Sequence, residues 1–191
     1  MNNLVKYLYE IGQLKKVRRT GWWIVGITNP ESVAEHSYRT SMIGLILAHL
    51  EKVDITTVLV MCLVHDMPET RINDLHWVAQ RYIKMGQAAE LVFDEQASQL
   101  PTELDNWFMD LFSQFEKQSS PEAIVASDAD KLELVLQARE YETQGYKYVE
   151  DWINNMKTAI VTDSAKQLFE EIITIEPREW WANLNTPPSN S

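Results

Sequence analysis

Apolar side chains return along most of this chain every three or four residues, which is the spacing of one face of an α-helix. No alternating run of apolar and polar residues is long enough to predict a strand. The pattern predicts helices over about 4–17, 32–50, 55–65, 75–84, 87–99, 102–115, 121–143, 148–160 and 164–175. The predicted fold class is therefore all-α, a compact single-domain helical bundle.

Three of these helices also carry clear start signals. Ser32 and Glu35 form a Ser-x-x-Glu pattern, in which each side chain can accept a hydrogen bond from the other residue's backbone N–H. Asp54 can cap the helix over 55–65, and Ser120 precedes a proline at the first helical position. On the helix that follows Ser32, His36 lies on the apolar stripe, so this imidazole is expected to face the core.

The most informative stretch is Val60–Glu69, an apolar run that ends in His65 and Asp66. Periodicity alone does not separate a buried helix from a buried strand here, but the run begins near Ile55 and its length favours a helix. Pro68 limits that helix, because proline lacks a backbone N–H and restricts the residue before it. A carboxylate at the end of a buried helix is costly unless it is paired or binds a metal ion. The sequence therefore predicts a partner for Asp66.

Length and charge narrow the class of protein. The 191 residues fit one domain, which we place at 1–185, and the polar residues 186–191 are predicted to form a disordered tail. The net charge of −11 at pH 7 disfavours a nucleic-acid polymer as a partner. It does not disfavour a small anion that is held by a few arginines.

The cysteine content and the hydropathy pattern bear on location. The single cysteine, Cys62, lies inside the apolar run, so no internal disulfide can form, and we interpret it as a small buried hydrophobe. No apolar segment approaches the length of a membrane span, and the N-terminal residues lack the pattern of a signal peptide. We therefore predict a cytoplasmic protein without membrane contact.

Three predicted helices bring polar groups toward the core: His36, the pair His65 and Asp66, and Asp130. Asp130 lies on a stripe of small and apolar residues, whereas Asp128 is expected to be more exposed. Taken singly, a buried histidine is more often a hydrogen-bonded core residue, and an aspartate is more often an ion-pair partner. Together, two imidazoles and two carboxylates suit one divalent transition-metal ion, with sites left for water. The set lacks the thiolates of a closed structural zinc site.

The same residues belong to an ordered series of motifs. In chain order these are Arg19-Thr-Gly-Trp22, Pro30-Glu-Ser-Val-Ala-Glu35-His36-Ser-Tyr-Arg39, His65-Asp66-Met-Pro-Glu69, and Asp130 followed by Leu136-Gln-Ala-Arg-Glu-Tyr141. Over about residues 4–160 the series resembles the HD-domain phosphohydrolases, and within them the small 5′-deoxynucleotidase branch. The resemblance implies a helical fold of the HD-domain type, one divalent metal ion and a homodimer. It also implies hydrolysis of nucleoside 5′-monophosphates, usually deoxy forms.

The resemblance further implies roles for single residues. The metal ion, which could be Mn, Co, Zn, Mg or Ni, would be held by His36, His65, Asp66 and Asp130. Glu69 resembles the catalytic carboxylate that orients or deprotonates the attacking water. Arg19 resembles the arginine that binds the phosphate, for which a guanidinium fork is well suited. Asp74 resembles a carboxylate at the sugar side of the substrate pocket.

Several alternatives stay open at the level of sequence. Arg18 lies beside Arg19 in a basic cluster and competes with it for the phosphate, although such clusters are mostly solvated faces. Trp22 or Trp23 can stack on a nucleobase, or either can belong to the core. The protein could also be a non-catalytic metal- or nucleotide-binding protein. A further alternative is hydrolysis of cyclic or polyphosphorylated nucleotides, although the additional motifs of those relatives are not found in the chain.

Overall fold

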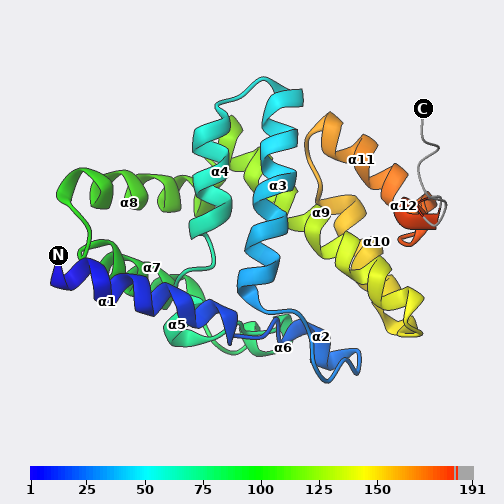
Figure 1. Cartoon of the computed structure of the whole chain (residues 1–191), viewed down its shortest axis with the longest axis horizontal. Helices are drawn as coiled ribbons and strands as arrows, with labels where there is room; N and C mark the ends of the chain where they lie inside the picture. Colours follow the sequence, from blue (N-terminus) through cyan, green and yellow to red (C-terminus); the bar gives the residue numbers. More distant parts are fainter. Residues whose placement is uncertain (183, 185–191) are drawn as a thin grey trace.

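Helix α3 (Val33–Glu51) is the central element of the computed structural model, which describes residues 1–182 and residue 184. It packs most extensively against α9 (Pro121–Thr143) and α4 (Ile55–Val64), and these two helices also contact each other. Figure 1 shows α3 and α4 side by side, joined by a short connection. The three helices that carry the predicted metal ligands therefore meet in the middle of the molecule.

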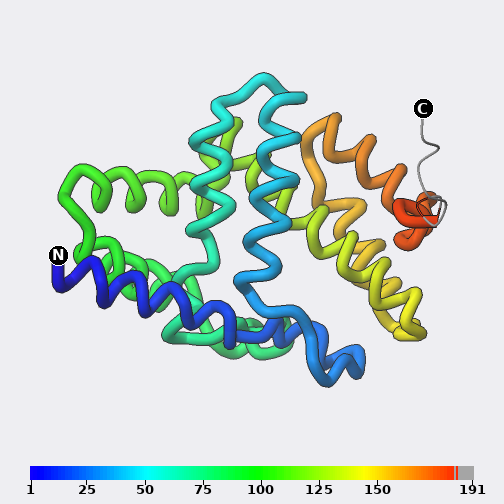
Figure 2. The backbone as a smooth tube through the Cα atoms, in the orientation of Figure 1, coloured from blue at the N-terminus to red at the C-terminus, as the bar shows by residue number. Residues whose placement is uncertain are grey.

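The other helices flank this centre on two sides (Figure 2). One side holds α1 (Asn2–Ile11), the 3-10 helix η1 (Gly12–Lys15), α7 (Met85–Ala97) and α8 (Thr102–Lys117). The other side holds the 3-10 helix η2 (Lys147–Val149), α10 (Glu150–Ala159), α11 (Asp163–Thr174) and α12 (Glu179–Ala182). Three four-residue helices lie within the connections: α2 (Gly21–Ile24), α5 (Glu69–Ile72) and α6 (Trp77–Gln80).

The predicted start signals are present as hydrogen bonds. Ser32 Oγ accepts from the N–H of Glu35 at 3.2 Å, and the Glu35 carboxylate accepts from the N–H of Ser32 at 2.7 Å. Asp54 Oδ1 accepts from the N–H of Thr57 at 2.7 Å, and Ser120 caps α9 ahead of a proline. The beginnings of α3, α4 and α9 are thus local consequences of the sequence.

The all-α prediction is confirmed, and the described residues contain no strand, only an isolated bridge between Arg18 and Ser32. The predicted loop over 18–30 contains α2, the polar stretch after Pro68 contains α5, and the helix predicted over 75–84 contracts to α6. Four-residue helices are too short for a periodic signal, so their form depends on tertiary contacts. The predicted tail, 186–191, lies outside the described residues. Within 1–182, no helix combines the length and hydrophobicity that crossing a lipid bilayer requires.

Two clusters of buried side chains hold the helices together. The larger cluster joins Leu47, Met61 and Leu132, one from each central helix, and the smaller one lies among α1, α4, α7 and α8. At Gly44, helices α3 and α4 are so close that an added Cβ would lie 2.7 Å from Cys62 Sγ. The Cys62 thiol is buried, as predicted.

Asp128 contradicts the prediction that it is more exposed than Asp130. Its side chain is fully buried and pairs with Lys131 Nζ at 3.2 Å, whereas the Asp130 side chain is 32% exposed. The Asp128 carboxylate accepts hydrogen bonds from the backbone N–H groups of Val161 and Thr162, at the start of α11. The stripe on α9 could not reveal this, because the covering segment comes from a distant part of the chain.

Candidate active site

Three long helices bring the four predicted metal ligands together. These residues, the ligand set, are His36 on α3, His65 and Asp66 at the end of α4, and Asp130 on α9. His36 Nε2 lies 3.0 Å from Asp130 Oδ1 and 3.7 Å from Asp66 Oδ2. His65 Nε2 lies 3.3 Å from Asp66 Oδ2 and 3.9 Å from Asp130 Oδ1. Ligands about 2 Å from a metal ion have spacings of this order, so the four atoms suit one ion.

Each imidazole has one nitrogen engaged and one directed at the ligand set. His36 Nδ1 lies 2.5 Å from Glu133 Oε2, and His65 Nδ1 lies 3.0 Å from the backbone carbonyl of Cys62. Because both partners accept hydrogen bonds, each Nδ1 carries a proton, and each Nε2 is the nitrogen that can bind a metal ion once it has lost any proton of its own. His65 Nε2 is buried and has no hydrogen-bond partner among the described residues. This is the arrangement of a metal-binding histidine.

The charges around the ligand set also favour a cation. Burial and Arg19 lower the pKa of His36, but Glu133 and Asp130 outweigh them and raise it to about 10. Burial raises the pKa of Asp130, but His36 and His65 outweigh it and lower the value to about 2. The carboxylates therefore keep protons on the imidazoles. A divalent ion would supply the same compensation without those protons.

Glu69 begins α5, directly after Pro68, and has an unsatisfied oxygen. Its Oε2 is buried without a hydrogen-bond partner in the described part of the chain. Burial raises the pKa of Glu69 well above its usual range, Asp66 and Asp74 raise it further, and Arg19 opposes them. A buried, unpaired carboxylate in the field of the ligand set is suited to accept a proton from water.

Arg19, rather than Arg18, contacts the ligand set. Arg19 Nη1 donates to Asp66 Oδ2 at 3.0 Å, whereas Arg18 Nη1 donates to the Pro30 carbonyl at 3.0 Å and lines a separate groove. Burial lowers the pKa of Arg19, but Asp66 and Asp130 outweigh it and raise the pKa above its usual range. A guanidinium has five N–H donors, so Arg19 can bind a phosphoryl group while it holds Asp66.

A cavity of about 170 Å³ opens beside Arg19. Its lining residues include Asp74, Trp22, Trp77, Gln80 and Trp152. Asp74 is fixed there by Thr20, whose N–H donates to Asp74 Oδ2 at 2.5 Å and whose hydroxyl donates to the Asp74 carbonyl at 2.8 Å. The predicted sugar-side carboxylate and the predicted phosphate-binding arginine therefore line one cavity.

The tryptophans near this cavity have different surroundings. Trp22 is only 1% exposed, stacks on Trp152 with ring centroids 4.9 Å apart, and donates its Nε1–H to Glu31. Trp22 therefore lines the cavity but has little ring surface free to contact a ligand. Trp23 is exposed but does not line the cavity. Trp77 lines the cavity and is 61% exposed, so its ring is open to a ligand.

Sequence reasoning missed three residues of this region: Glu133, Arg39 and Trp77. Glu133 follows Asp130 by three residues and Arg39 follows His36 by three, which places each pair on one helical face. That spacing was a usable signal. Trp77 had none, because its place beside Arg19, Trp22 and Trp152 depends on distant parts of the chain.

Comparison with known proteins identifies the family. The HD-domain family model matches residues 11–173. A 5′-deoxynucleotidase of Dictyostelium discoideum is 32% identical over 178 residues, which cover 88% of this chain and 91% of that protein. A 5′-deoxynucleotidase of Homo sapiens is 32% identical over 146 residues, covering 76% of this chain and 71% of that protein.

Solved structures share the fold. A conserved hypothetical protein from Pyrococcus furiosus has a TM-score of 0.77 at 28% identity, covering 90% of this chain and 99% of that one. A cyanophage S-2L HD phosphohydrolase, bound to dA and one catalytic Zn²⁺ ion, has a TM-score of 0.57 over 87% of this chain and 96% of its own. At 22% identity, this second likeness shows the fold alone. From the family model and the relatives together, the chain belongs to the HD-domain phosphohydrolases, the family that its motifs resemble.

Proposed function

We propose that this protein is a metal-dependent 5′-nucleotidase that releases phosphate from nucleoside 5′-monophosphates and prefers the deoxy forms. One observation carries the proposal: Arg19 contacts Asp66 of the ligand set and also lines the cavity, and the buried Glu69 lies in the field of Asp66, Asp74 and Arg19. The 5′-deoxynucleotidase relatives support the same substrate class.

The ligand set would hold one divalent ion. When bound, the ion would polarise a phosphoryl oxygen and lower the pKa of a nearby water. Two imidazoles and two carboxylates accept Mn, Co, Zn, Mg or Ni. The Nδ1–H bonds of His36 and His65 support this assignment, since they leave both Nε2 atoms to bind an ion in place of a proton.

Arg19 would bind the phosphoryl oxygens that the metal ion leaves free. Its contact with Asp66, a member of the ligand set, supports this role. A planar fork can donate two parallel hydrogen bonds to a phosphate, which a lysine cannot do. Because a single arginine reaches the site, a terminal phosphomonoester fits better than a polyphosphate chain.

Glu69 would act on the attacking water. The water oxygen attacks phosphorus, Glu69 accepts the water's proton, and the bond between phosphorus and O5′ breaks. The same proton can then pass to O5′, so that the nucleoside leaves as a neutral alcohol. The raised pKa of Glu69, caused mainly by burial, suits this exchange, because a more basic carboxylate accepts a proton from water more readily.

The cavity beside Arg19 would hold the nucleoside. Asp74 would face the sugar, where a fixed carboxylate can disfavour a 2′-hydroxyl by crowding. Trp77 would stack on the base, because its ring is the exposed aromatic surface of the cavity. Gln80, one helical turn further along, would lie at the edge of the same base.

A substrate panel tests the proposal. Phosphate release would be measured from deoxy- and ribonucleoside 5′-monophosphates, 3′-monophosphates, triphosphates and cyclic nucleotides, with Mn, Co, Mg, Zn or no added metal. We expect the deoxynucleoside 5′-monophosphates to be cleaved fastest and only with metal. Faster cleavage of cyclic or polyphosphorylated nucleotides would assign the protein to another branch of the HD-domain phosphohydrolases. Nucleotide binding without turnover under any metal would favour a non-catalytic role.

We also propose that a second copy of this chain covers an exposed apolar face of α1, α3 and α4. The exposed side chains there are Leu8, Tyr38, Met42, Leu45, Ile46 and Leu63. Leu8, Tyr38 and Leu63 line an apolar groove of about 620 Å³ between α1 and the central helices, and Met42, Leu45 and Ile46 follow Tyr38 along α3. An apolar surface of this extent usually marks an interaction site, and a homodimer would bury the same patch on both subunits.

The oligomeric state tests this second proposal. Sedimentation analysis at micromolar concentration is expected to give a dimer. Ile46→Glu places a charge in the face and is expected to give a folded monomer. Leu91→Glu is the matched control, because Leu91 is also exposed but lies on α7, outside the face of α1, α3 and α4. A monomeric wild-type protein would contradict the proposal.

A further inference from the structure

A fully buried carboxylate stands behind the proposed ligand His36. Glu133 has no exposed surface, and its Oε2 lies 2.5 Å from His36 Nδ1. It follows Asp130 by three residues on α9, so one face of this helix carries both a proposed ligand and the group that orients another. With Nδ1–H donated to Glu133, His36 Nε2 faces Asp130 Oδ1 at 3.0 Å.

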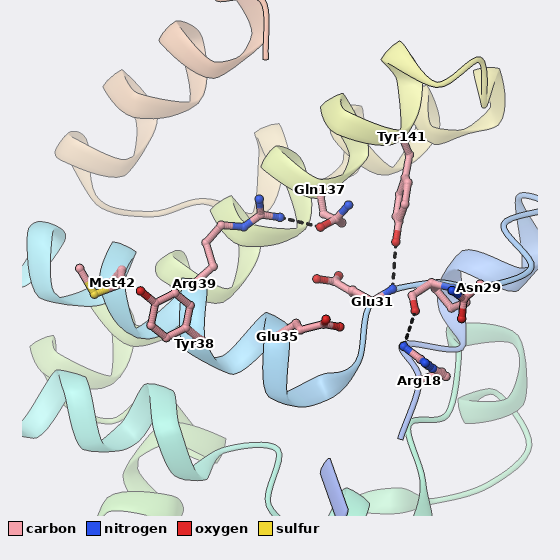
Figure 3. A pocket seen from close by; sticks show the side chains of 10 residues that line it. Arg18, Asn29, Glu31, Glu35, Tyr38, Arg39, Met42, Gln137 and Tyr141 are labelled. Atoms are coloured by element: carbon pink, nitrogen blue, oxygen red, sulfur yellow. Dashed lines mark hydrogen bonds between the residues drawn. The ribbon is translucent and has the colours of Figure 1, made fainter. Parts of the chain in front are cut away.

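A buried carboxylate needs a countercharge, and Arg39 supplies it. Arg39 Nε and Nη2 lie 2.9 and 2.8 Å from Glu133 Oε1. The same guanidinium donates from Nη1 to Glu140 and from Nη2 to Gln137, each at 2.7 Å. Figure 3 shows Arg39 reaching from α3 to Gln137 on α9. Arg39 is thus held by three α9 side chains and contacts the opposite oxygen of the carboxylate that holds His36.

The surroundings of Glu133 explain why this countercharge matters. Ligand atoms of Glu31, His36 and Glu133 lie within 4.8 Å of one another. Without Arg39, Glu133 Oε1 would lose the two guanidinium donors that fix it, and the carboxylate could turn away from His36 Nδ1. Glu31, His36 and Glu133 are not a second metal site, because Glu133 and His36 Nδ1 already share a hydrogen bond.

We propose that Glu133 and Arg39 are positioning residues that orient His36 and thereby set how tightly the protein retains its metal ion. The inference rests on the ligand set of the proposed function. Arg39 lines a groove of about 630 Å³ with Tyr38, Met42 and Tyr141 (Figure 3), and this groove shares no lining residue with the cavity beside Arg19. Neither positioning residue lines the proposed substrate cavity, so their effect falls on metal affinity.

Metal affinity is therefore the quantity that tests the proposal. Metal-free protein would be titrated with Co²⁺ and Zn²⁺ in competition with a chelating indicator, and the visible spectrum of the Co²⁺ form would be recorded. We expect Glu133→Ala to weaken binding about a hundredfold and Glu133→Gln about tenfold, since an amide oxygen still accepts from Nδ1–H. Arg39→Gln is expected to resemble Glu133→Gln, and Arg39→Lys to bind more tightly than Arg39→Gln. The Co²⁺ spectrum should shift in the Glu133 variants.

Asp128→Asn is the matched control. Asp128 is also a fully buried carboxylate on α9, but it caps α11 and does not contact His36. Its loss is expected to lower the free energy of unfolding and to leave Co²⁺ affinity and spectrum unchanged. If Asp128→Asn weakens metal binding as much as Glu133→Gln does, the effect reflects general loosening of α9 and the proposal fails.

A variant of a proposed metal ligand distinguishes failure of this proposal from failure of the proposed function. If Asp66→Ala loses the metal while Glu133→Ala binds within threefold of the wild type, the positioning role is wrong and the ligand set stands. If both variants keep the metal, the ligand set is wrong, and the inference fails with it. If Glu133→Ala does not fold, Glu133→Gln and Arg39→Gln decide: unchanged affinity in both contradicts the proposal.

Discussion

The two halves of the site are built from different kinds of structure. The ligand set stands on the long helices α3, α4 and α9, which pack on one another through the main core. The proposed substrate residues, Arg19, Glu69, Asp74 and Trp77, stand on connections and four-residue helices. Metal binding thus depends on the same packing that stabilises the fold, whereas substrate recognition depends on segments with little secondary structure of their own.

The substrate half also contains a strained backbone conformation. Asn73, at the end of α5, has φ 60° and ψ 164°, a combination that residues other than glycine rarely adopt. The next residue, Asp74, is bound by Thr20 on both its side chain and its carbonyl. The turn at Asn73 therefore holds Asp74 in place, at a strain of about 1–3 kcal/mol. Substitutions in the ligand set and among the proposed substrate residues test this comparison.

The largest loss of activity is expected from a substitution in the ligand set. Asp66→Ala should lower kcat/KM roughly a thousandfold, because a catalytic metal ion contributes several kcal/mol to the transition state. Elemental analysis should show the bound ion lost together with phosphate release. Asp163→Ala, at an exposed position, is the control and should change neither. Full metal occupancy in Asp66→Ala would contradict the ligand assignment.

Glu69→Ala should impair catalysis without affecting metal binding. We expect kcat to fall roughly a hundredfold or more, the size of a lost general base, while metal content and KM stay near the wild-type values. Steady-state kinetics and elemental analysis of the same preparation measure both. An unchanged kcat would make Glu69 an ordinary buried acid.

Metal affinity should rise with pH. In the metal-free protein the raised pKa of His36, about 10, keeps a proton on Nε2 at pH 8, and this proton must leave when Nε2 binds an ion. Affinity should therefore increase up to about tenfold per pH unit below that pKa. Calorimetric titrations in two buffers of different ionisation enthalpy count the released protons. A histidine with an ordinary pKa of about 6.5 would release almost none at pH 8.

Trp77→Ala should weaken substrate binding without changing metal binding. Stacking on a base is worth about 1–3 kcal/mol, so KM for a nucleoside 5′-monophosphate should rise about tenfold. Deoxyribose 5-phosphate, which has no base, should be hydrolysed equally by variant and wild type. Trp23→Ala is the control, since Trp23 is exposed outside the cavity. A larger effect at Trp23 would reverse the assignment.

Asn73→Gly should give the smallest change, and one of opposite sign. Glycine adopts the observed φ without strain, so the free energy of unfolding should rise by about 1 kcal/mol after the entropy cost of glycine is subtracted. Urea unfolding measures it, with Asn155→Gly within α10 as a control that should destabilise. A destabilised Asn73→Gly would show that the Asn73 side chain matters more than its backbone.

The approach of the four proposed ligands was predictable from the sequence because they stand on or at the end of long periodic helices. His36 follows a capping box, and His65 and Asp66 end an apolar run, so burial and direction could be derived locally. Asp128 was misplaced because a segment more than thirty residues away covers it. Trp77 was missed because its place in the cavity depends on distant parts of the chain. The site assignments, the division into a domain and a tail, and the cytoplasmic location stay predictions.

The two histidines of the ligand set differ in how they tolerate mutation. His65 is oriented by the backbone carbonyl of Cys62, which is present whatever side chain occupies that position. His36 is oriented by the Glu133 side chain, which a single substitution removes. Inherited changes that weaken the metal site without altering a ligand should therefore accumulate on α9 and around Arg39. On the corresponding turn of α4, core packing limits the side chain of Cys62, but a substitution there leaves the carbonyl that orients His65 in place.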